Sequence, residues 1–257
     1  VEVLDAHRLK ITPAAKANSE SSYSVGRHSY GKFRTGNVEV YLLDTRSLRD
    51  VFDTKDPISH GLSMIGRAQR EWLMRSMKES DADFFFLAST VNLMIPHVGS
   101  PGSTGPIEGK DDAWTAFVEE REMLIKFWES LNKPVIVMTG DLHNSFAVKV
   151  TDKVWEFCSG PHNSANHPAR SEGDRPPNGP FNSRGRQCDI RWSTYFRNDV
   201  PPRLRRKPVY AVATINNVFE NPDESGNKRW VAFDRPHVVI QYYDGVTGDL
   251  LYAEPVH

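Results

Sequence analysis

The sequence lacks the features that mark several specialised classes of protein. It contains only two cysteines, Cys158 and Cys188, which are too few for a disulfide-stapled scaffold. A loop-like region separates them, so a disulfide and two free thiols are both compatible with the sequence. No apolar run approaches the ~18 residues of a transmembrane helix, and no basic segment followed by an apolar one opens the chain. We therefore expect neither a membrane span nor an export signal in this chain.

A large net charge of either sign is also lacking. The 32 Lys and Arg residues nearly balance the 33 Asp and Glu residues, so no overall field attracts a polyanion. We expect no nucleic acid as a specific ligand. With 39% hydrophobic and 25% charged residues, the composition is that of an ordinary globular protein. A chain of this length suffices for one large domain, and we expect a single domain over residues 1–257.

Buried strands and amphipathic helices alternate through the first part of the chain. The apolar, β-rich run at 38–44 is typical of a strand covered on both faces, and it should be central. The other predicted strands are 83–88, 134–139, 146–150 and 154–157, and the predicted helices are 65–77 and 111–131. The alternation predicts an α/β (α+β) fold with a covered sheet.

The alternation breaks at residues 160–207. This segment is rich in proline and glycine and carries ten Lys or Arg against four Asp or Glu. We interpret it as a long basic loop, either functional or an insertion. Residues 96–106 read as a second surface loop. The later predicted strands are 209–215, 230–233, 238–243 and 250–253.

The most informative segment begins where the strand at 134–139 ends. Gly140-Asp141-Leu142-His143-Asn144 places a carboxylate, an imidazole and an amide at the carboxyl end of that strand, where α/β sheets bind ligands. These donor groups suit divalent and trivalent cations. Alternatively, Asp141 caps a turn and His143 lines the core. Spacing alone does not separate the two interpretations.

Four motifs occur in a distinctive order between residues 30 and 160. They are Val40-Tyr41-Leu42-Leu43-Asp44-Thr45-Arg46, Ile65-Gly66-x-x-Gln69-x-x-Trp72-Leu73, Asp112-x-Trp114 with Glu120-Arg121, and Thr139-Gly140-Asp141-Leu142-His143-Asn144-Ser145. Together they resemble the PhoD-like alkaline phosphatase family, a branch of the calcineurin-like metallophosphoesterases.

The resemblance implies a fold, a reaction and a set of ligands. The fold would be a β-sandwich flanked by helices (αββα), and the reaction the metal-dependent hydrolysis of phosphate mono- or diesters. Two or three metal ions, iron with calcium or similar, would form the site. Asp141 and Asn144 would be metal ligands, and His143 would join them or contact phosphate, with Asp141 and His143 as the catalytic residues. Clustered cations would neutralise the phosphoryl oxygens of the small substrate.

Three further residues are candidates for contacting the phosphate ester. Arg46 follows a buried strand, although a structural Asp–Arg pair is the simpler use. His162 lies in a loop with other polar groups, and surface polarity explains it equally well. Arg186 belongs to the arginines of 160–207, which would form an electropositive rim, although solvated charges explain most of them individually.

The family's earlier ligand motifs, a Gly-Asp pair and a Trp-Asp-Asp-His-like segment, are not found in this chain. The resemblance therefore implies the C-terminal portion of a catalytic domain, completed by a preceding segment or an N-terminal chain. The alternative is a non-catalytic fragment or subunit of the same fold. Members of the family are often exported, which implies a periplasmic or extracellular location.

Overall fold

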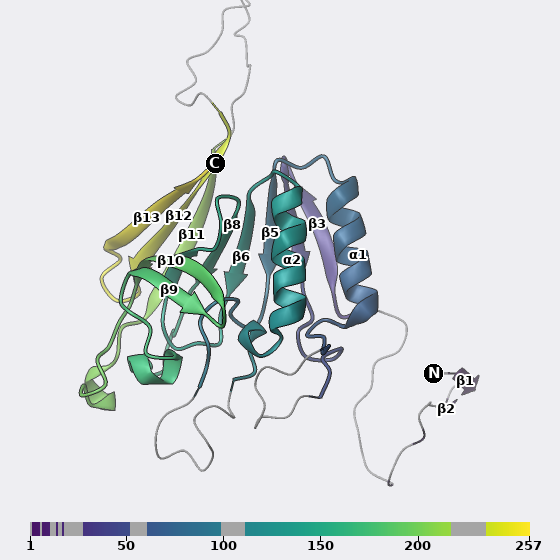
Figure 1. The fold of residues 1–257 in the computed structure, drawn as a ribbon, viewed down its shortest axis with the longest axis horizontal. Helices are drawn as coiled ribbons and strands as arrows, with labels where there is room; N and C mark the ends of the chain where they lie inside the picture. The colour runs from purple at the N-terminus through teal and green to yellow at the C-terminus, as the bar shows by residue number, and fades with distance from the viewer. Residues whose placement is uncertain are drawn as a thin grey trace, which may run out of the picture.

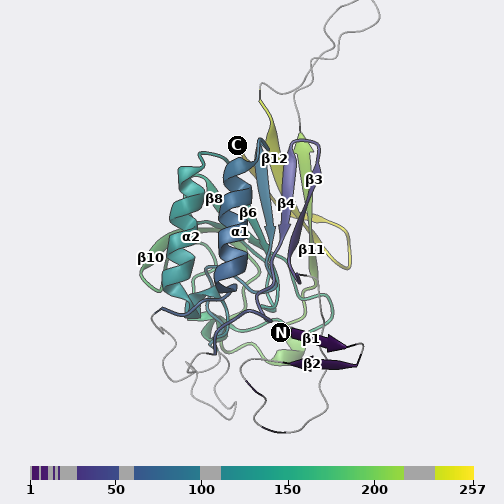
Figure 2. The same cartoon turned by 90° about the vertical axis from the view of Figure 1, so that its right-hand side faces the viewer.

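Two packed β-sheets and one layer of helices form the protein. The computed structural model describes residues 2–5, 7–10, 14, 17, 28–51, 61–98, 111–216 and 235–257. An eight-stranded mixed sheet carries helices on one face and a three-stranded antiparallel sheet on the other (Figure 1 and Figure 2). The predicted α+β class is confirmed. Both helices lie on the same face, so the described residues do not include the second helical layer expected from the αββα arrangement.

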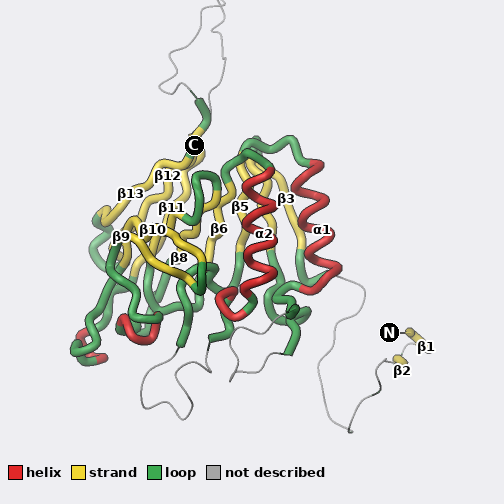
Figure 3. Tube along the Cα trace, in the orientation of Figure 1, coloured by secondary structure: helices red, strands yellow, loops and turns green. Residues whose placement is uncertain are grey.

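The strand order of the larger sheet is β3-β4-β5-β6-β8-β7-β10-β9. In that order the strands are Gly31–Thr35, Val38–Leu42, Phe84–Ala88, Val135–Thr139, Val154–Cys158, Phe146–Lys149, Arg186–Ser193 and Gly179–Ser183. The smaller sheet contains β11 (Val209–Asn216), β12 (His237–Asp244) and β13 (Leu250–Val256). The helices are α1 (Gly66–Glu79) and α2 (Val118–Ser130), with single 3₁₀ turns at η2 (Trp114–Ala116), η3 (Ala169–Glu172) and η4 (Pro202–Leu204) (Figure 3). A separate hairpin consists of β1 (Glu2–Asp5) and β2 (Arg8–Lys10).

The sequence builds two hydrophobic cores by placing apolar residues at most positions of the central strands, on both faces of the sheet. In β5, Phe85 and Leu87 pack toward the helices, whereas Phe84 and Phe86 pack against the small sheet. Alternating side chains of a strand point to opposite faces, so a continuous apolar run serves both layers. Each fully buried phenylalanine contributes roughly 2 to 3 kcal/mol of stability.

The parallel strands bring their carboxyl ends to one edge of the larger sheet. β4, β5, β6 and β8 are parallel neighbours in that order. The segments that follow them therefore meet at the lower edge in Figure 1. This edge is where sheets with parallel strands bind ligands.

Most predicted elements are confirmed, with three differences. β4 is an interior strand but lies second from the edge, because β3 pairs outside it. The second helix begins at Val118 rather than near residue 111, since Phe117 (φ −124°, ψ 51°) leaves helical geometry after η2. Two further predictions are not compared with the structure, because the strand at 230–233 and most of the loop at 96–106 lie outside the described residues.

The third difference is the segment 160–207, which is not irregular throughout. Its middle forms the hairpin β9–β10, which extends the larger sheet beside β7. A two-residue turn at Arg184 (φ 50°) and Gly185 (φ 95°) joins the strands, and Cys188 and Ile190 alternate toward the core. The prolines and charges around this alternation concealed it in the sequence. Its identification as an insertion stays a prediction.

Both cysteines are buried free thiols. Cys158 lies in β8 and Cys188 in β10, with β7 between these strands. Burial raises the pKa of Cys188 to about 12 and that of Cys158 well above its ordinary value. Neither thiol is therefore ionised near neutral pH. Among the described residues, no helix is long and apolar enough to cross a bilayer.

Candidate metal centre

Three potential metal ligands converge at the carboxyl edge of the larger sheet. His97, Asp112 and Asp141 each offer one ligand atom, and these atoms lie within 4.8 Å of one another. His97 follows β5, Asp112 precedes η2, and Asp141 follows β6. Two carboxylates and an imidazole are a donor set that suits several divalent and trivalent cations. We call these residues the ligand trio.

A tight turn aims Asp141. Its φ of 70° is unusual for a residue other than glycine, and the Leu142 amide donates to the Gly140 carbonyl at 2.9 Å. This contact across one residue is typical of a γ-turn with positive φ, which is rare and strained. Aspartate adopts positive φ more readily than most residues, although the conformation still costs of the order of 1 kcal/mol. Strain of this kind clusters at functional sites.

Two arginines from the segment after β4 hold Asp112. Arg46 Nη1 lies 2.5 Å from Asp112 Oδ2, and Arg49 Nη1 donates to the Asp112 carbonyl at 3.2 Å. The Trp114 amide also donates to the Asn92 carbonyl at 3.2 Å, which fixes this segment against the end of β5. Arg46 is thus part of an Asp–Arg pair, one of the two uses that the sequence left open. Its contact with phosphate stays a prediction.

The buried carboxylate of Asp111 links the segment of Asp112 to that of His97. Asp111 Oδ1 accepts from the amides of His97 (3.4 Å) and Ala113 (3.2 Å), and Oδ2 accepts from Thr115 Oγ1 (2.6 Å). Burial raises the pKa of Asp111, against the opposing effect of these donors. One side chain thereby holds together two segments that carry ligands.

Glu156 of β8 anchors the chain before His97. Its carboxylate accepts from the amides of Leu93 (2.6 Å) and Met94 (2.8 Å) and from Thr139 Oγ1 (2.9 Å) at the end of β6. Complete burial raises the pKa of Glu156 to about 7. The segments after β5 and β6, which carry His97 and Asp141, are thus tied to one buried group.

Two further imidazoles, those of His167 and His143, continue from the His97 ring of the ligand trio. The ring centroid of His167 lies 4.4 Å from that of His143 and 5.0 Å from that of His97. His143 Nδ1 lies 3.1 Å from the Ala165 carbonyl. A carbonyl oxygen can only accept a hydrogen bond, so this contact requires the ring proton on Nδ1. Nε2 is then the ring nitrogen that is available to accept a proton. His143 therefore lies near the centre without being one of the ligand trio.

Asn144 is buried and engaged by protein partners. Its Nδ2 donates to the His167 carbonyl (3.0 Å) and to Glu172 Oε1 (2.7 Å). Its Oδ1 accepts from Asn166 Nδ2 (3.0 Å) and Thr194 Oγ1 (3.1 Å). This geometry favours a structural role, in which Asn144 binds the segment after β8 to the end of β6. Its assignment as a metal ligand stays a prediction.

A buried ion pair supports the same region. Glu172 and Arg175 have fully buried side chains, and Arg175 Nε lies 2.7 Å from Glu172 Oε2. Arg175 Nη2 also donates to the Thr194 carbonyl at 3.0 Å. Burial raises the pKa of Glu172, and the Arg175 guanidinium opposes this effect. The pair holds the carboxylate that Asn144 contacts.

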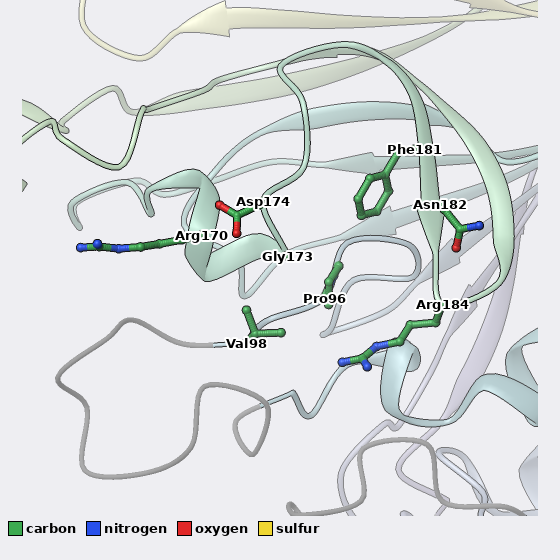
Figure 4. Close-up of a pocket in the computed structure, with 8 residues that line it drawn as sticks. All are labelled: Pro96, Val98, Arg170, Gly173, Asp174, Phe181, Asn182 and Arg184. Carbon is green, nitrogen blue, oxygen red and sulfur yellow. The ribbon is translucent and has the colours of Figure 1, made fainter.

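A pocket of about 340 Å³ lies beside the segment that carries His97 (Figure 4). Pro96 and Val98, which flank His97 in the sequence, form part of its wall. Its charged lining residues are Arg170, Arg184 and Asp174. Arg184 Nη2 also lies 3.5 Å from Asp111 Oδ2. The pocket therefore offers cationic groups next to the candidate metal centre.

The other two predicted phosphate contacts are His162 and Arg186. His162 is exposed, and Arg186 forms an ion pair with Glu122 of α2, with Nε 2.6 Å from Oε2. Their contacts with phosphate stay predictions. Sequence reasoning missed His97 and assigned Asp112 to the start of a helix. The one sequence feature that could have pointed to His97 and Asp112 is that both residues flank the glycine- and proline-rich stretch after β5.

The glycine at position 173 lets η3 approach the wall of the pocket. Gly173 has φ 68°, and a Cβ added there would lie 2.8 Å from Pro96 Cγ. We expect Gly173→Ala to lower the free energy of unfolding by about 2 kcal/mol or more, because left-handed strain and the clash with a rigid ring act together. Gly36→Ala is the matched control, since Gly36 (φ 56°) has no atom within 4 Å of the added Cβ. Urea denaturation measures both variants, and equal losses would show that Pro96 yields without penalty.

Comparison with known proteins adds one finding. A family model described as PhoD-like phosphatase matches residues 11–209 of the 257-residue chain. The match includes the ligand trio, the turn at 140–142 and the stacked imidazoles. No curated protein matches the chain.

Proposed function

The chain belongs to the PhoD-like phosphatase family, and on that premise we propose that it hydrolyses phosphate esters with a metal ion held by His97, Asp112 and Asp141. The observation that supports this proposal is the convergence of these three ligand atoms within 4.8 Å at the carboxyl edge of the sheet. A bound cation would neutralise charge on the phosphoryl group and promote ionisation of the attacking water.

The remaining groups of the site have separate roles in this proposal. Arg46 and Arg49 orient Asp112 and add positive charge beside it. His143 Nε2 takes a proton from the attacking water and passes it to the leaving-group oxygen, since the Ala165 carbonyl holds Nδ1 in its protonated form. The pocket beside His97 receives the part of the ester that is not transferred.

The metals follow from the donor set and from the family resemblance. Carboxylate oxygens suit calcium, and an imidazole with carboxylates suits iron, so both ions are compatible with the ligand trio. Further ligands from a preceding segment, and export from the cytoplasm, stay predictions. The ligand trio favours an enzyme over a non-catalytic subunit of the same fold.

Chelation tests the proposed function. Hydrolysis of p-nitrophenyl phosphate and bis(p-nitrophenyl) phosphate by the purified protein is expected to fall to background after treatment with a chelator. Activity should return when iron with calcium, or a comparable cation, is added back. Plasma mass spectrometry of the same samples identifies the ions. Undiminished turnover by protein shown to contain no metal would disprove the proposal.

A further inference from the structure

Two arginines, one of them in the wall of the pocket, have buried N–H groups without acceptors. These are Nε of Arg170 and both Nε and Nη1 of Arg205. A guanidinium does not give up its proton in a protein, so these nitrogens remain donors. A buried donor without an acceptor costs roughly 1 to 3 kcal/mol and is rare in native proteins. Three such donors on two neighbouring cations call for a ligand.

The segment that carries Arg170 lies beside Arg205, because the amide of Asn166, four residues before Arg170, donates to the Arg205 carbonyl at 2.7 Å. Burial lowers the pKa of Arg205, and the positive charge of Arg170 lowers it further. Within the described part of the chain, neither forms a salt bridge with a carboxylate. Asp174 lines the same pocket as Arg170, and its Oδ1 accepts from Asn198 Nδ2 at 3.2 Å. The Arg170–Arg205 pair is therefore a concentration of positive charge that is not neutralised internally.

Short connections join this pair to the candidate metal centre. The Arg205 carbonyl accepts from the Asn166 amide at 2.7 Å, and the preceding residue, Ala165, contacts His143 Nδ1. Arg170 lines the pocket whose wall includes the residues on either side of His97. Figure 4 shows the Arg170 side chain extending from η3 on the side away from Phe181 and Arg184. Arg170 thus lies at one end of the pocket, and Arg205 is connected to the segment that precedes it through Asn166.

We propose that Arg170 and Arg205 form an oxyanion site that binds a second anionic group of the substrate, next to the phosphoryl group that is hydrolysed. The position of the reacting group in this inference rests on the proposed function. Guanidinium groups bind phosphate and carboxylate through paired N–H donors, which supplies the missing acceptors. The preferred substrates are therefore phosphate esters with an additional phosphate or carboxylate on the leaving-group side.

Titration with inorganic phosphate tests the anion site without requiring turnover. Calorimetry of the purified protein is expected to show about tenfold weaker binding at this site in Arg205→Gln and Arg170→Gln, because each variant loses charged hydrogen bonds. Arg203→Gln is the matched control, since Arg203 lies in the same basic stretch and is exposed. Asp141→Asn separates this site from phosphate bound at the metal centre. Unchanged affinity in both arginine variants overturns the inference.

A thermal unfolding scan separates an anion site from a structural role. If the pair serves to bind an anion, either glutamine variant should be at least as stable as the parent in phosphate-free buffer, because the repulsion is removed. Phosphate should raise the melting temperature of the parent more than that of the variants. A lower melting temperature of both variants in phosphate-free buffer indicates a structural role and counts against the inference.

A matched substrate pair distinguishes the substrate's own anion from free phosphate. Phenyl phosphate is compared with 3-carboxyphenyl phosphate, whose leaving group carries a carboxylate, by the release of inorganic phosphate. The parent should prefer the carboxylated compound by about tenfold in kcat/KM, Arg205→Gln should lose this preference, and the control Arg203→Gln should keep it. Arginine-dependent phosphate binding without a substrate preference overturns the substrate part of the inference. If the parent hydrolyses neither compound, the proposed function fails, and the phosphate titration still decides whether the anion site exists.

Discussion

Replacement of Asp141 by asparagine is expected to lower kcat/KM for phosphate-ester hydrolysis by at least about 100-fold and to release bound metal. The substitution removes one negative charge from the ligand trio but keeps the size and shape of the side chain. Asparagine tolerates a φ of 70° as well as aspartate does, so the turn at 140–142 should survive. Loss of a group that only supports a metal ligand costs 10- to 100-fold, roughly, and loss of a ligand should cost more.

The control for this prediction is Asp152→Asn. Asp152 is an exposed carboxylate in the turn between β7 and β8, where it pairs with Lys149. Its replacement should leave metal content and kcat/KM unchanged. Metal analysis and steady-state kinetics on the same preparations decide the matter. An Asp141→Asn variant with full metal content and full turnover would remove Asp141 from the site.

Arg175→Met is expected to lower the free energy of unfolding by about 3 to 5 kcal/mol. The variant leaves the fully buried carboxylate of Glu172 without its cation, and an isolated buried charge is strongly destabilising. Asn144 Nδ2 donates to the same carboxylate, so the end of β6 should loosen as well. Urea denaturation at neutral pH measures the loss.

An exposed pair provides the comparison. Arg197 and Asp199 are ion-paired with side chains that are 75% and 67% exposed, and Arg197→Met should cost at most about 1 kcal/mol. The double variant Glu172→Gln, Arg175→Met should recover part of the loss, since it no longer buries an unpaired charge. Equal effects of Arg175→Met and Arg197→Met would show that burial of Glu172 carries no penalty.

The sequence predicted the elements whose residues repeat with a clear period. The apolar runs of β5 and β6 and the helical stripe of α1 are local signals, and the structure confirms all three. The hairpin β9–β10 was missed because prolines and arginines interrupt its alternation, and its place in the sheet depends on pairing with β7, about 40 residues earlier in the sequence.

The candidate site was predictable only where a strand end and its ligand are adjacent in sequence. Asp141 directly follows β6 and was therefore found. His97 and Asp112 lie close to Asp141 only because separate segments of the chain return to one edge of the sheet. No local sequence pattern predicts that proximity. The partners of Asn144 lie 22 to 50 residues later in the chain, so these hydrogen bonds of Asn144 could not be predicted from the sequence.

The turn at residues 140–142 has a further consequence for metal capture. Because the backbone of the turn fixes the direction of the Cα–Cβ bond of Asp141, binding of an ion would require only rotations of the side chain at this position. The backbone of the turn loses its conformational freedom when the chain folds, so this loss of entropy does not weaken the later binding of an ion. Discrimination between cations at this corner of the sheet should therefore depend on ionic charge and radius rather than on reshaping of the polypeptide.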